Sequence, residues 1–336
     1  MDPLLEAHRL RAAEVLRPEV HAYYATGAGQ GTTAEEAAAA WAELRLRPRV
    51  LRDVSRVDTS TELLGTRLAT PVLVAPSALH GLAHDAGEAE TARGAAAAGS
   101  LLVVSTRASR RLEEVPAGPW WFQAYVMKDR GLTRGLVQRA AAAGATAVVL
   151  TGDTPYLGRR PGAGRRALAT DPLVNLVGAS AADLEQDPSA GLEAIDELTA
   201  ASGLPVLVKG VLRGDDAVRC LDAGAAGVVV SNHGGRQLDR AVATARALPD
   251  VVDAVDGRAP VLVDGGLTCG LDVLCALALG ADAVLLGRPV LWALAAGGAA
   301  GVQECLEAVT GELSHVMGLA GARTLAEIDR ELVVRA

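Results

Sequence analysis

The sequence predicts a closed barrel of eight parallel β-strands, a (β/α)8 or TIM barrel, with a helical extension before it and helices after it. Three observations indicate this fold. Short Val/Leu runs bounded by Gly or Pro recur along the chain, Ala-rich stretches of helical character separate them, and nearly every run ends in a polar residue. Continuous apolar runs of this length are typical of parallel strands buried on both faces.

The eight strands are expected, in chain order, near 71–75, 101–105, 120–125, 146–151, 205–209, 226–231, 260–264 and 282–287. Three of these runs read Pro-Val-Leu-Val, and a Pro at the first residue of a strand costs no ladder hydrogen bond. Four others follow an Ala-Gly or Leu-Gly pair, whose Gly ends the preceding helix in the left-handed conformation. Eight βα units in succession favour a closed barrel over the alternative, an open doubly wound sheet.

The helices between the strands are expected within the Ala-rich stretches, for example 87–98, 129–143, 214–223 and 270–279. Residues 1–70 predict two or three helices, with Thr32 or Thr33 capping the segment from Ala34 to Leu44. The tail from about 289 to 330 also predicts helix.

No linker or second domain is indicated. One domain is therefore expected over 1–336, with the barrel at about 70–288. The irregular, Gly/Ala/Asp-rich stretch 161–190 follows the fourth strand and is expected to form an active-site lid.

The composition excludes several classes of protein. Half of the 336 residues are hydrophobic but only 3% are aromatic, so Ala, Val and Leu must build the core. The net charge is −8 and no basic run suits nucleic acid. The four cysteines have no CxxC spacing and no His/Cys cluster suits a metal, so free thiols are expected. Without a signal peptide or a run of about eighteen apolar residues, we expect a cytoplasmic protein that does not enter a membrane.

Catalytic residues of a TIM barrel lie at the C-terminal ends of its strands. Here the expected strands end, in order, in Ala75-Pro76-Ser77, Ser105, Gln123 with Tyr125, Thr151-Gly152-Asp153, Lys209, Ser231-Asn232-His233-Gly234-Gly235-Arg236, Asp264-Gly265-Gly266 and Gly287-Arg288. Charged groups that converge at one end of a barrel carry a desolvation cost unless they bind something. A functional site is therefore predicted at this end.

Two parts of this site follow from chemistry. Glycines after the last two strands let backbone N–H groups approach an anion, so Gly265, Gly266, Gly287 and Arg288 predict a phosphate site. A neutral His233 can accept a proton near pH 7 and Asp153 can stabilise the resulting imidazolium. Lys209 has two possible roles, a Schiff-base lysine or a cation beside an electron-rich cofactor.

Read together, these strand ends resemble the FMN-dependent 2-hydroxy acid oxidases and dehydrogenases. The most specific stretch runs from Ser231 to Asp239, with sequence SNHGGRQLD. Supporting motifs cover nearly the whole chain in the family's order, among them Tyr23-Tyr24-Ala25-Thr26-Gly27-Ala28, Phe122-Gln123-Ala124-Tyr125, Leu207-Val208-Lys209-Gly210 and Gly287-Arg288-Pro289.

The resemblance implies that a small (S)-2-hydroxy acid is oxidised to the 2-oxo acid, with flavin N5 accepting the hydride equivalent and His233, partnered by Asp153, acting as base. Tyr23, Arg236 and Arg160 would bind the substrate and Tyr125 would hydrogen-bond near its hydroxyl. Lys209 would lie beside flavin N1 and O2. The flavin ring would also contact Ala75, Pro76, Ser77, Ser105, Gln123, Thr151 and Ser231. The ribityl phosphate would be bound by Asp264, Gly265, Gly266, Gly287 and Arg288.

The oxidant and the assembly follow from the resemblance in the same way. Ala78 matches the oxidases, whereas some dehydrogenases carry Gly at this position. It therefore favours dioxygen over another electron acceptor, and reduction of dioxygen would give H2O2. A homotetramer is also expected.

Two positions depart from the family's pattern. Leu267-Thr268 follows Asp-Gly-Gly, where the family usually carries a hydrophobic residue and an Arg that binds the phosphate, so FMN binding is expected to be weaker. Arg107 replaces an aromatic residue that lines the substrate pocket of glycolate oxidase. Either Arg107 points to solvent, or it contacts a polar or anionic group of the substrate distal to the carboxylate.

Two other functions are weighed against this one. A different FMN- or phosphate-binding barrel would keep the phosphate site, but would lack the His-Gly-Gly-Arg stretch. A non-catalytic flavin-binding protein would have no use for all six of Tyr23, Tyr125, Asp153, Lys209, His233 and Arg236.

Overall fold

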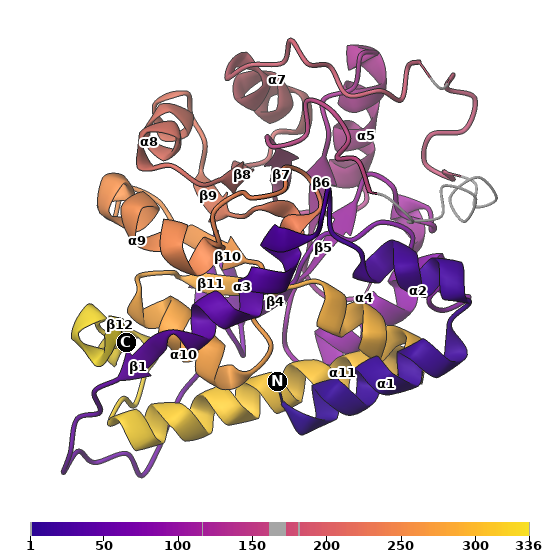
Figure 1. Cartoon of the computed structure of the whole chain (residues 1–336). Coiled ribbons are helices and arrows are strands. Elements are labelled where there is room, and N and C mark those ends of the chain that lie inside the picture. Colours follow the sequence, from indigo (N-terminus) through magenta and orange to yellow (C-terminus); the bar gives the residue numbers. More distant parts are fainter. Residues whose placement is uncertain (1, 116, 161–172, 181, 336) are drawn as a thin grey trace.

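Eight parallel strands close into a barrel in the order β10-β11-β4-β5-β6-β7-β8-β9, which confirms the predicted fold (Figure 1). The structure is a computed structural model that describes residues 2–115, 117–160, 173–180 and 182–335. The strands are β4 (Val72–Val74), β5 (Leu102–Ser105), β6 (Trp120–Ala124), β7 (Val148–Thr151), β8 (Val206–Val211), β9 (Gly227–Val230), β10 (Val261–Asp264) and β11 (Ala283–Leu286). Each lies within two residues of its predicted bounds.

Helices surround the barrel and connect most of its strands. They are α4 (Glu88–Ala97), α5 (Arg130–Ala142), α7 (Glu193–Ser202), α8 (Gly214–Asp222), α9 (Thr244–Val255) and α10 (Gly270–Ala278). Only a 3-10 turn, Leu112–Glu114, is described between β5 and β6. After β11 the chain enters α11 (Arg288–Ala320), which is broken at Gly297 and Gly298. None of the described helices has the length and apolar character needed to cross a bilayer.

The apolar core has two layers, one inside the barrel and one between the strands and the helices. Trp121 fills the barrel interior with Leu73, Leu207 and Leu262, all of them fully buried. Because aromatic residues are scarce, Val, Leu and Ala make up most of the outer layer. Both faces of each strand are therefore buried, as the continuous apolar runs predict.

The segment before the barrel is only partly helical, so the expectation of helices alone over residues 1–70 is incomplete. Three helices, α1 (Pro3–Val15), α2 (Pro18–Ala25) and α3 (Thr32–Ala42), precede β1 (Leu44–Leu46) and a hairpin of β2 (Thr61–Leu63) and β3 (Thr66–Leu68). The hairpin packs Leu63 and Leu68 into the interior layer of the core. At the other end of the chain, β12 (Val333–Arg335) pairs antiparallel with β1.

Helix α3 is capped differently from the prediction. It begins at Thr32, and its N-cap is Gly31, so neither Thr32 nor Thr33 is the capping residue. The Asp239 carboxylate instead accepts the backbone N–H groups of Thr33 at 3.1 Å and of Gln30 at 2.8 Å. A residue from the loop after β9 therefore fastens α3 over the C-terminal end of the barrel.

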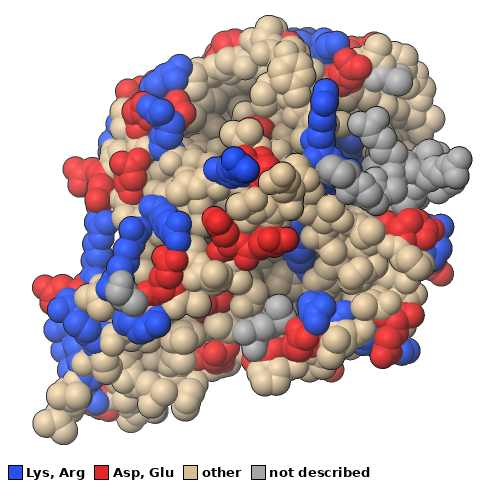
Figure 2. Space-filling model, in the orientation of Figure 1, with Lys and Arg blue, Asp and Glu red and all other residues tan. Residues whose placement is uncertain are grey.

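Charged side chains are mixed over the visible face of the molecule. Figure 2 shows basic and acidic residues interspersed there. Many form ion pairs at the surface, such as Arg246 with Glu43 and Arg258 with Asp222. The four cysteines are unpaired, and burial raises the pKa of Cys305 to about 12.

Two helical glycines test the packing of the outer layer. A Cβ on Gly94 in α4 would lie 2.5 Å from the carbonyl oxygen of Ala299 and 2.7 Å from Cβ of Val302 in α11. We expect Gly94→Ala to lower the free energy of unfolding by about 1–3 kcal/mol, because the two helices would have to separate. The measurement is the midpoint of denaturant unfolding.

Gly135→Ala in α5 is the matched control. Nothing lies within 4 Å of its Cβ position. Alanine should therefore raise the free energy of unfolding by about 0.5–1 kcal/mol, because it restricts the unfolded chain. Equal effects of the two substitutions would contradict the close packing of α4 on α11.

Candidate active site

A cavity of about 400 Å³ opens at the C-terminal ends of the barrel strands. Helices α1, α2 and α3 and the start of α11 complete its walls. The strand-end residues predicted for the site line much of it, among them Ala75, Pro76, Ser77, Ser105, Lys209, His233, Asp264, Gly265, Gly266, Gly287 and Arg288. The substrate-side residues Tyr23, Arg107, Tyr125, Arg160 and Arg236 line it as well.

His233 and Asp153 meet across two strand ends. Nδ1 of His233 lies 3.0 Å from Oδ1 of Asp153. Burial favours the neutral acid, but the hydrogen bond and the charge of His233 outweigh it and lower the pKa of Asp153. The carboxylate is therefore ionised, and this contact leaves Nε2 of His233 for a ligand.

The loop after β9 adopts a conformation that its sequence makes possible. His233, Gly234 and Gly235 all have positive φ, at 59°, 60° and 73°. A Cβ on Gly235 would lie 2.6 Å from the backbone nitrogen of Ala34. Gly235 therefore serves both the turn that presents His233 and the close approach of α3.

Gly266 has a structural role in addition to the one predicted for it. A Cβ there would lie 2.5 Å from the carbonyl of Ala37 in α3. By contrast, a Cβ on Gly287 would meet nothing closer than Cβ of Ala75 at 3.8 Å, an ordinary van der Waals distance. Both glycines line the cavity, but only Gly266 is required by the packing of α3.

Lys209 is a buried cation held on two sides. Its Nζ donates to Oγ of Ser231 at 2.7 Å and pairs with Oδ2 of Asp264 at 2.7 Å. Ser231 Oγ also accepts the backbone N–H of His233 at 3.1 Å. Because both contacts hold Nζ in place and engage it with a carboxylate, this arrangement fits the role of a fixed cation rather than that of a Schiff-base nucleophile.

Three buried polar side chains on neighbouring strands form a chain of hydrogen bonds. Gln123 Nε2 donates to Oγ1 of Thr151 at 2.9 Å, and its Oε1 accepts from Oγ of Ser105 at 3.2 Å. The three side chains lie at the ends of the adjacent strands β5, β6 and β7, and the parallel register places Lys209 of β8 next to Thr151. This network holds the polar groups at fixed positions.

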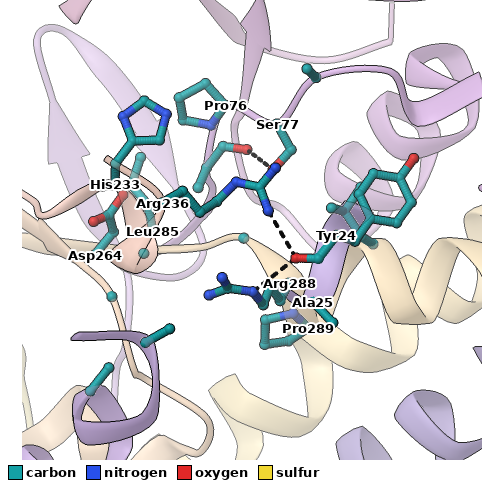
Figure 3. A pocket seen from close by; sticks show the side chains of 18 of the residues that line it. Tyr24, Ala25, Pro76, Ser77, His233, Arg236, Asp264, Leu285, Arg288 and Pro289 are labelled. Atoms are coloured by element: carbon teal, nitrogen blue, oxygen red, sulfur yellow. Dashed lines mark hydrogen bonds between the residues drawn. The ribbon is translucent and has the colours of Figure 1, made fainter. Parts of the chain in front are cut away.

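Arg236 and Arg288 are anchored to the end of α2. Nη1 of Arg236 donates to the carbonyls of Tyr23 at 2.8 Å and Tyr24 at 3.1 Å. Nε of Arg288 donates to the same Tyr24 carbonyl at 3.0 Å (Figure 3). Burial lowers the pKa of Arg236 to about 10 and the charge of Arg160 acts in the same direction, but the guanidinium stays protonated at neutral pH.

The two tyrosines each face arginine side chains. The Tyr23 ring lies 5.0 Å from the guanidinium carbons of both Arg160 and Arg236. The Tyr125 ring lies 6.0 Å from that of Arg107. Burial raises the pKa of Tyr125 to about 12, so its hydroxyl remains a hydrogen-bond donor at neutral pH.

Several charged groups at this site keep a buried atom with no hydrogen-bond partner among the described residues. They are Arg160 Nη1, Arg288 Nη2, Asp153 Oδ2 and Asp264 Oδ1. A buried polar atom without a partner costs on the order of 1–3 kcal/mol. Such atoms at one site indicate that a polar ligand completes it.

The structure also places residues in the cavity wall that the sequence reasoning missed. Arg9 from α1 lines the cavity, and its guanidinium pairs with Glu6. His21 also lines it and stacks on Trp292 with ring centroids 5.1 Å apart. These residues come from α1, α2 and α11, outside the strand ends, so no strand-end pattern could have identified them.

Two further expectations concern the neighbouring loops. Residues 161–172 of the expected lid lie outside the described residues, whereas Asn175 accepts the backbone N–H of Leu112 at 3.2 Å. Thr268, where the family usually carries Arg, donates its backbone N–H and hydroxyl to Asp272 at 2.7 and 3.1 Å. Its side chain therefore binds the start of α10 and supplies no cation.

Comparison with known proteins agrees with this geometry. The chain matches the model of the FMN-dependent dehydrogenase family over residues 12–335. It is 45% identical to an L-lactate oxidase of Nostoc sp. over 91% of both chains. It is 43% identical to a peroxisomal (S)-2-hydroxy-acid oxidase of Oryza sativa, over 96% of this chain and 93% of that one.

Solved structures give the same result. Mandelate oxidase with (S)-4-hydroxymandelic acid superimposes with a TM-score of 0.92 at 40% identity and covers 99% of each chain. Mandelate oxidase with benzoyl-formic acid gives a TM-score of 0.91 at 41% identity, over 99% of this chain and 98% of that one. The chain therefore belongs to the FMN-dependent dehydrogenase family and is an enzyme whose cofactor is FMN.

Proposed function

We propose that the enzyme oxidises a small (S)-2-hydroxy acid to the corresponding 2-oxo acid, with His233 as the base. One observation carries this proposal. The imidazole of His233, paired with Asp153, shares a cavity with the buried guanidinium of Arg236. A base beside a carboxylate-binding cation is what a 2-hydroxy acid requires.

The residues of the cavity fit FMN. Lys209 presents a buried cation, and Arg288 has a buried Nη2 atom that lacks a partner among the described residues. Gly287 lines the cavity, and because it has no Cβ its backbone can approach an anion. When bound, FMN supplies the acceptor for the two electrons that leave the substrate.

We assign the flavin contacts from the cavity lining and the hydrogen bonds behind it. The ring would be held by Ala75, Pro76, Ser77, Ser105 and Lys209, which line the cavity, and by Gln123, Thr151 and Ser231, which belong to the hydrogen-bond networks of Ser105 and Lys209. The phosphate would be held by Gly265, Gly266, Gly287 and Arg288, which also line the cavity. Asp264 is assigned differently from the sequence expectation. Its carboxylate already pairs with Lys209 and would repel a phosphate. Because its Oδ1 has no partner in the described part of the chain, that atom suits a ribityl hydroxyl instead.

The substrate carboxylate is assigned to Arg236. Carbonyls at the end of α2 occupy its Nη1, which leaves Nε and Nη2 for a bidentate contact. The Tyr23 ring lies beside this guanidinium and also beside that of Arg160. Arg160 supplies a second cation, whose Nη1 has no hydrogen-bond partner among the described residues. Together they would orient C2 of the substrate in the cavity.

The proton chemistry then follows from the hydrogen bonds. Nε2 of His233 accepts the proton of the substrate, and the Asp153 carboxylate stabilises the imidazolium. Tyr125 keeps its proton and donates to the oxygen at C2. The base serves equally whether the hydroxyl proton or the C2 proton leaves first.

The second substrate is assigned to dioxygen, which would give H2O2. Ala78 lines the cavity, and the relatives are named as oxidases. The alternative acceptor of a dehydrogenase would show itself as slow reoxidation of the reduced enzyme in air.

Replacement of the base separates this function from flavin binding alone. We expect His233→Ala to remain yellow and folded, but to slow anaerobic bleaching by a 2-hydroxy acid by about 10²–10⁴-fold. Asp153→Asn should act in the same direction, because the neutral amide no longer stabilises the imidazolium. The measurement is stopped-flow absorbance of the bound flavin.

His315→Ala is the matched control, because His315 is exposed on α11 and lies outside the cavity. It should bleach at the wild-type rate. Unchanged bleaching in His233→Ala would remove His233 from the role of base. A yellow wild-type protein that no 2-hydroxy acid bleaches would favour a non-catalytic flavin-binding protein.

Arg288 tests the phosphate end of the site. We expect Arg288→Gln to raise the Kd for FMN by about 10- to 100-fold, because it removes a charge-assisted hydrogen bond. The measurement is quenching of flavin fluorescence when apoprotein is added. Riboflavin, which has no phosphate, is the control, and an equal loss of riboflavin affinity would contradict the assignment.

A further inference from the structure

We infer that Arg107 is a second anion-binding residue of the substrate cavity, and that the preferred substrates are 2-hydroxy acids with a second carboxylate. The inference rests on the proposed function and deepens it. It concerns the far end of the substrate, whereas the base and the 1-carboxylate site stay as assigned.

The cationic side chains of the cavity outnumber their carboxylate partners. Six cationic side chains line it: Arg9, Arg107, Arg160, Lys209, Arg236 and Arg288. Two of them have carboxylate partners, since Arg9 pairs with Glu6 and Lys209 with Asp264. The other four form no ion pair with any carboxylate in the described part of the chain.

FMN and a simple 2-hydroxy acid do not use all four of these cations. The phosphate accounts for Arg288, and the 1-carboxylate accounts for Arg236 and Arg160. Arg107 is left without an anion. A partly buried guanidinium without a partner is costly, so its place in the cavity wall is best explained by an anion that arrives with the substrate.

The backbone of Arg107 is held firmly in place. Arg107 lies two residues after the end of β5, and its backbone N–H donates to Oγ of Ser105 at 3.1 Å. Its carbonyl accepts the backbone N–H of Leu79 at 3.0 Å. The side chain therefore starts from a fixed point between two strand ends, which suits a binding residue.

Arg107 also lies near the residues assigned to the reacting end of the substrate. Its guanidinium carbon lies 6.0 Å from the centre of the Tyr125 ring. The charges of both Arg107 and Arg236 act on the Tyr125 hydroxyl and oppose the rise of its pKa. Tyr125 thus lies near both cations, and a short chain with a carboxylate at each end could contact both.

Matched pairs of substrates test this directly. (S)-2-hydroxyglutarate is compared with (S)-2-hydroxypentanoate, and (S)-malate with (S)-2-hydroxybutanoate, so that each pair differs only in the second carboxylate. We expect the holoenzyme to reduce its flavin faster with the diacid of at least one pair, by about 10-fold or more in kcat/KM. Two chain lengths are tested because the distance between Arg107 and the 1-carboxylate site determines which diacid can contact both.

Substitutions at position 107 identify the source of the preference. Arg107→Gln should lower kcat/KM for the preferred diacid by about 10- to 100-fold and change that of its monoacid partner little. Arg107→Lys should restore part of the preference because it keeps the charge. Arg111→Gln is the matched control, since Arg111 is exposed in the same loop outside the cavity, and it should behave as wild type.

A second readout does not depend on turnover. Binding of 2-oxoglutarate and of oxaloacetate to the oxidised holoenzyme is followed by the change in flavin absorbance, with 2-oxopentanoate and 2-oxobutanoate as their monoacid partners. Arg107→Gln should raise the Kd of the diacid alone. Thermal unfolding of each variant checks that the fold is intact.

The outcomes distinguish failure of the role inferred for Arg107 from failure of the proposed function. The inference is overturned if the holoenzyme does not prefer either diacid, or if Arg107→Gln affects both members of a pair equally. If no member of either pair reduces the flavin, the proposed function fails, and the binding measurement then decides the role of Arg107 by itself.

Discussion

Buried charged groups require partners, and this requirement determines how the residues of the active site are arranged. Lys209, Arg236 and Arg288 are all removed from most solvent at the C-terminal end of the barrel. Lys209 finds Asp264 and Ser231, and the two arginines find carbonyls at the end of α2. Both arginines also line the cavity, so the protein holds these ligand-binding groups in place before a ligand arrives.

The topology of the barrel explains how these groups meet. Parallel strands bring their C-terminal ends to one rim, so residues far apart in the chain, such as Asp153 and His233, come within hydrogen-bonding distance. Helix α3 then closes over this rim. Its close approach depends on Gly235 and Gly266, where any side chain would collide with it. The glycine-rich loops thus line the cavity and also allow α3 to pack closely against the end of the barrel.

Much of this could be predicted from the sequence, because buried strands and the residues that end them leave local signals. The hairpin of β2 and β3 could not, because its turn places Leu64 and Gly65 at positive φ, where Asn-Gly would be the usual signal. The cap of α3 could not be predicted either, because the carboxylate that accepts its N–H groups belongs to Asp239, which lies 206 residues from Thr33 in the chain. Arg9 reaches the cavity from a helix whose own sequence shows no sign of a site.

A structure of the holoenzyme with a bound 2-oxo acid tests the central claim most directly, because it shows which atoms the ligands satisfy. The account predicts that the phosphate contacts Nη2 of Arg288, that Arg236 binds the 1-carboxylate, and that Nε2 of His233 lies within hydrogen-bonding distance of the oxygen at C2. A carboxylate bound away from Arg236, or an imidazole that has turned from Asp153 and from the ligand, would contradict it.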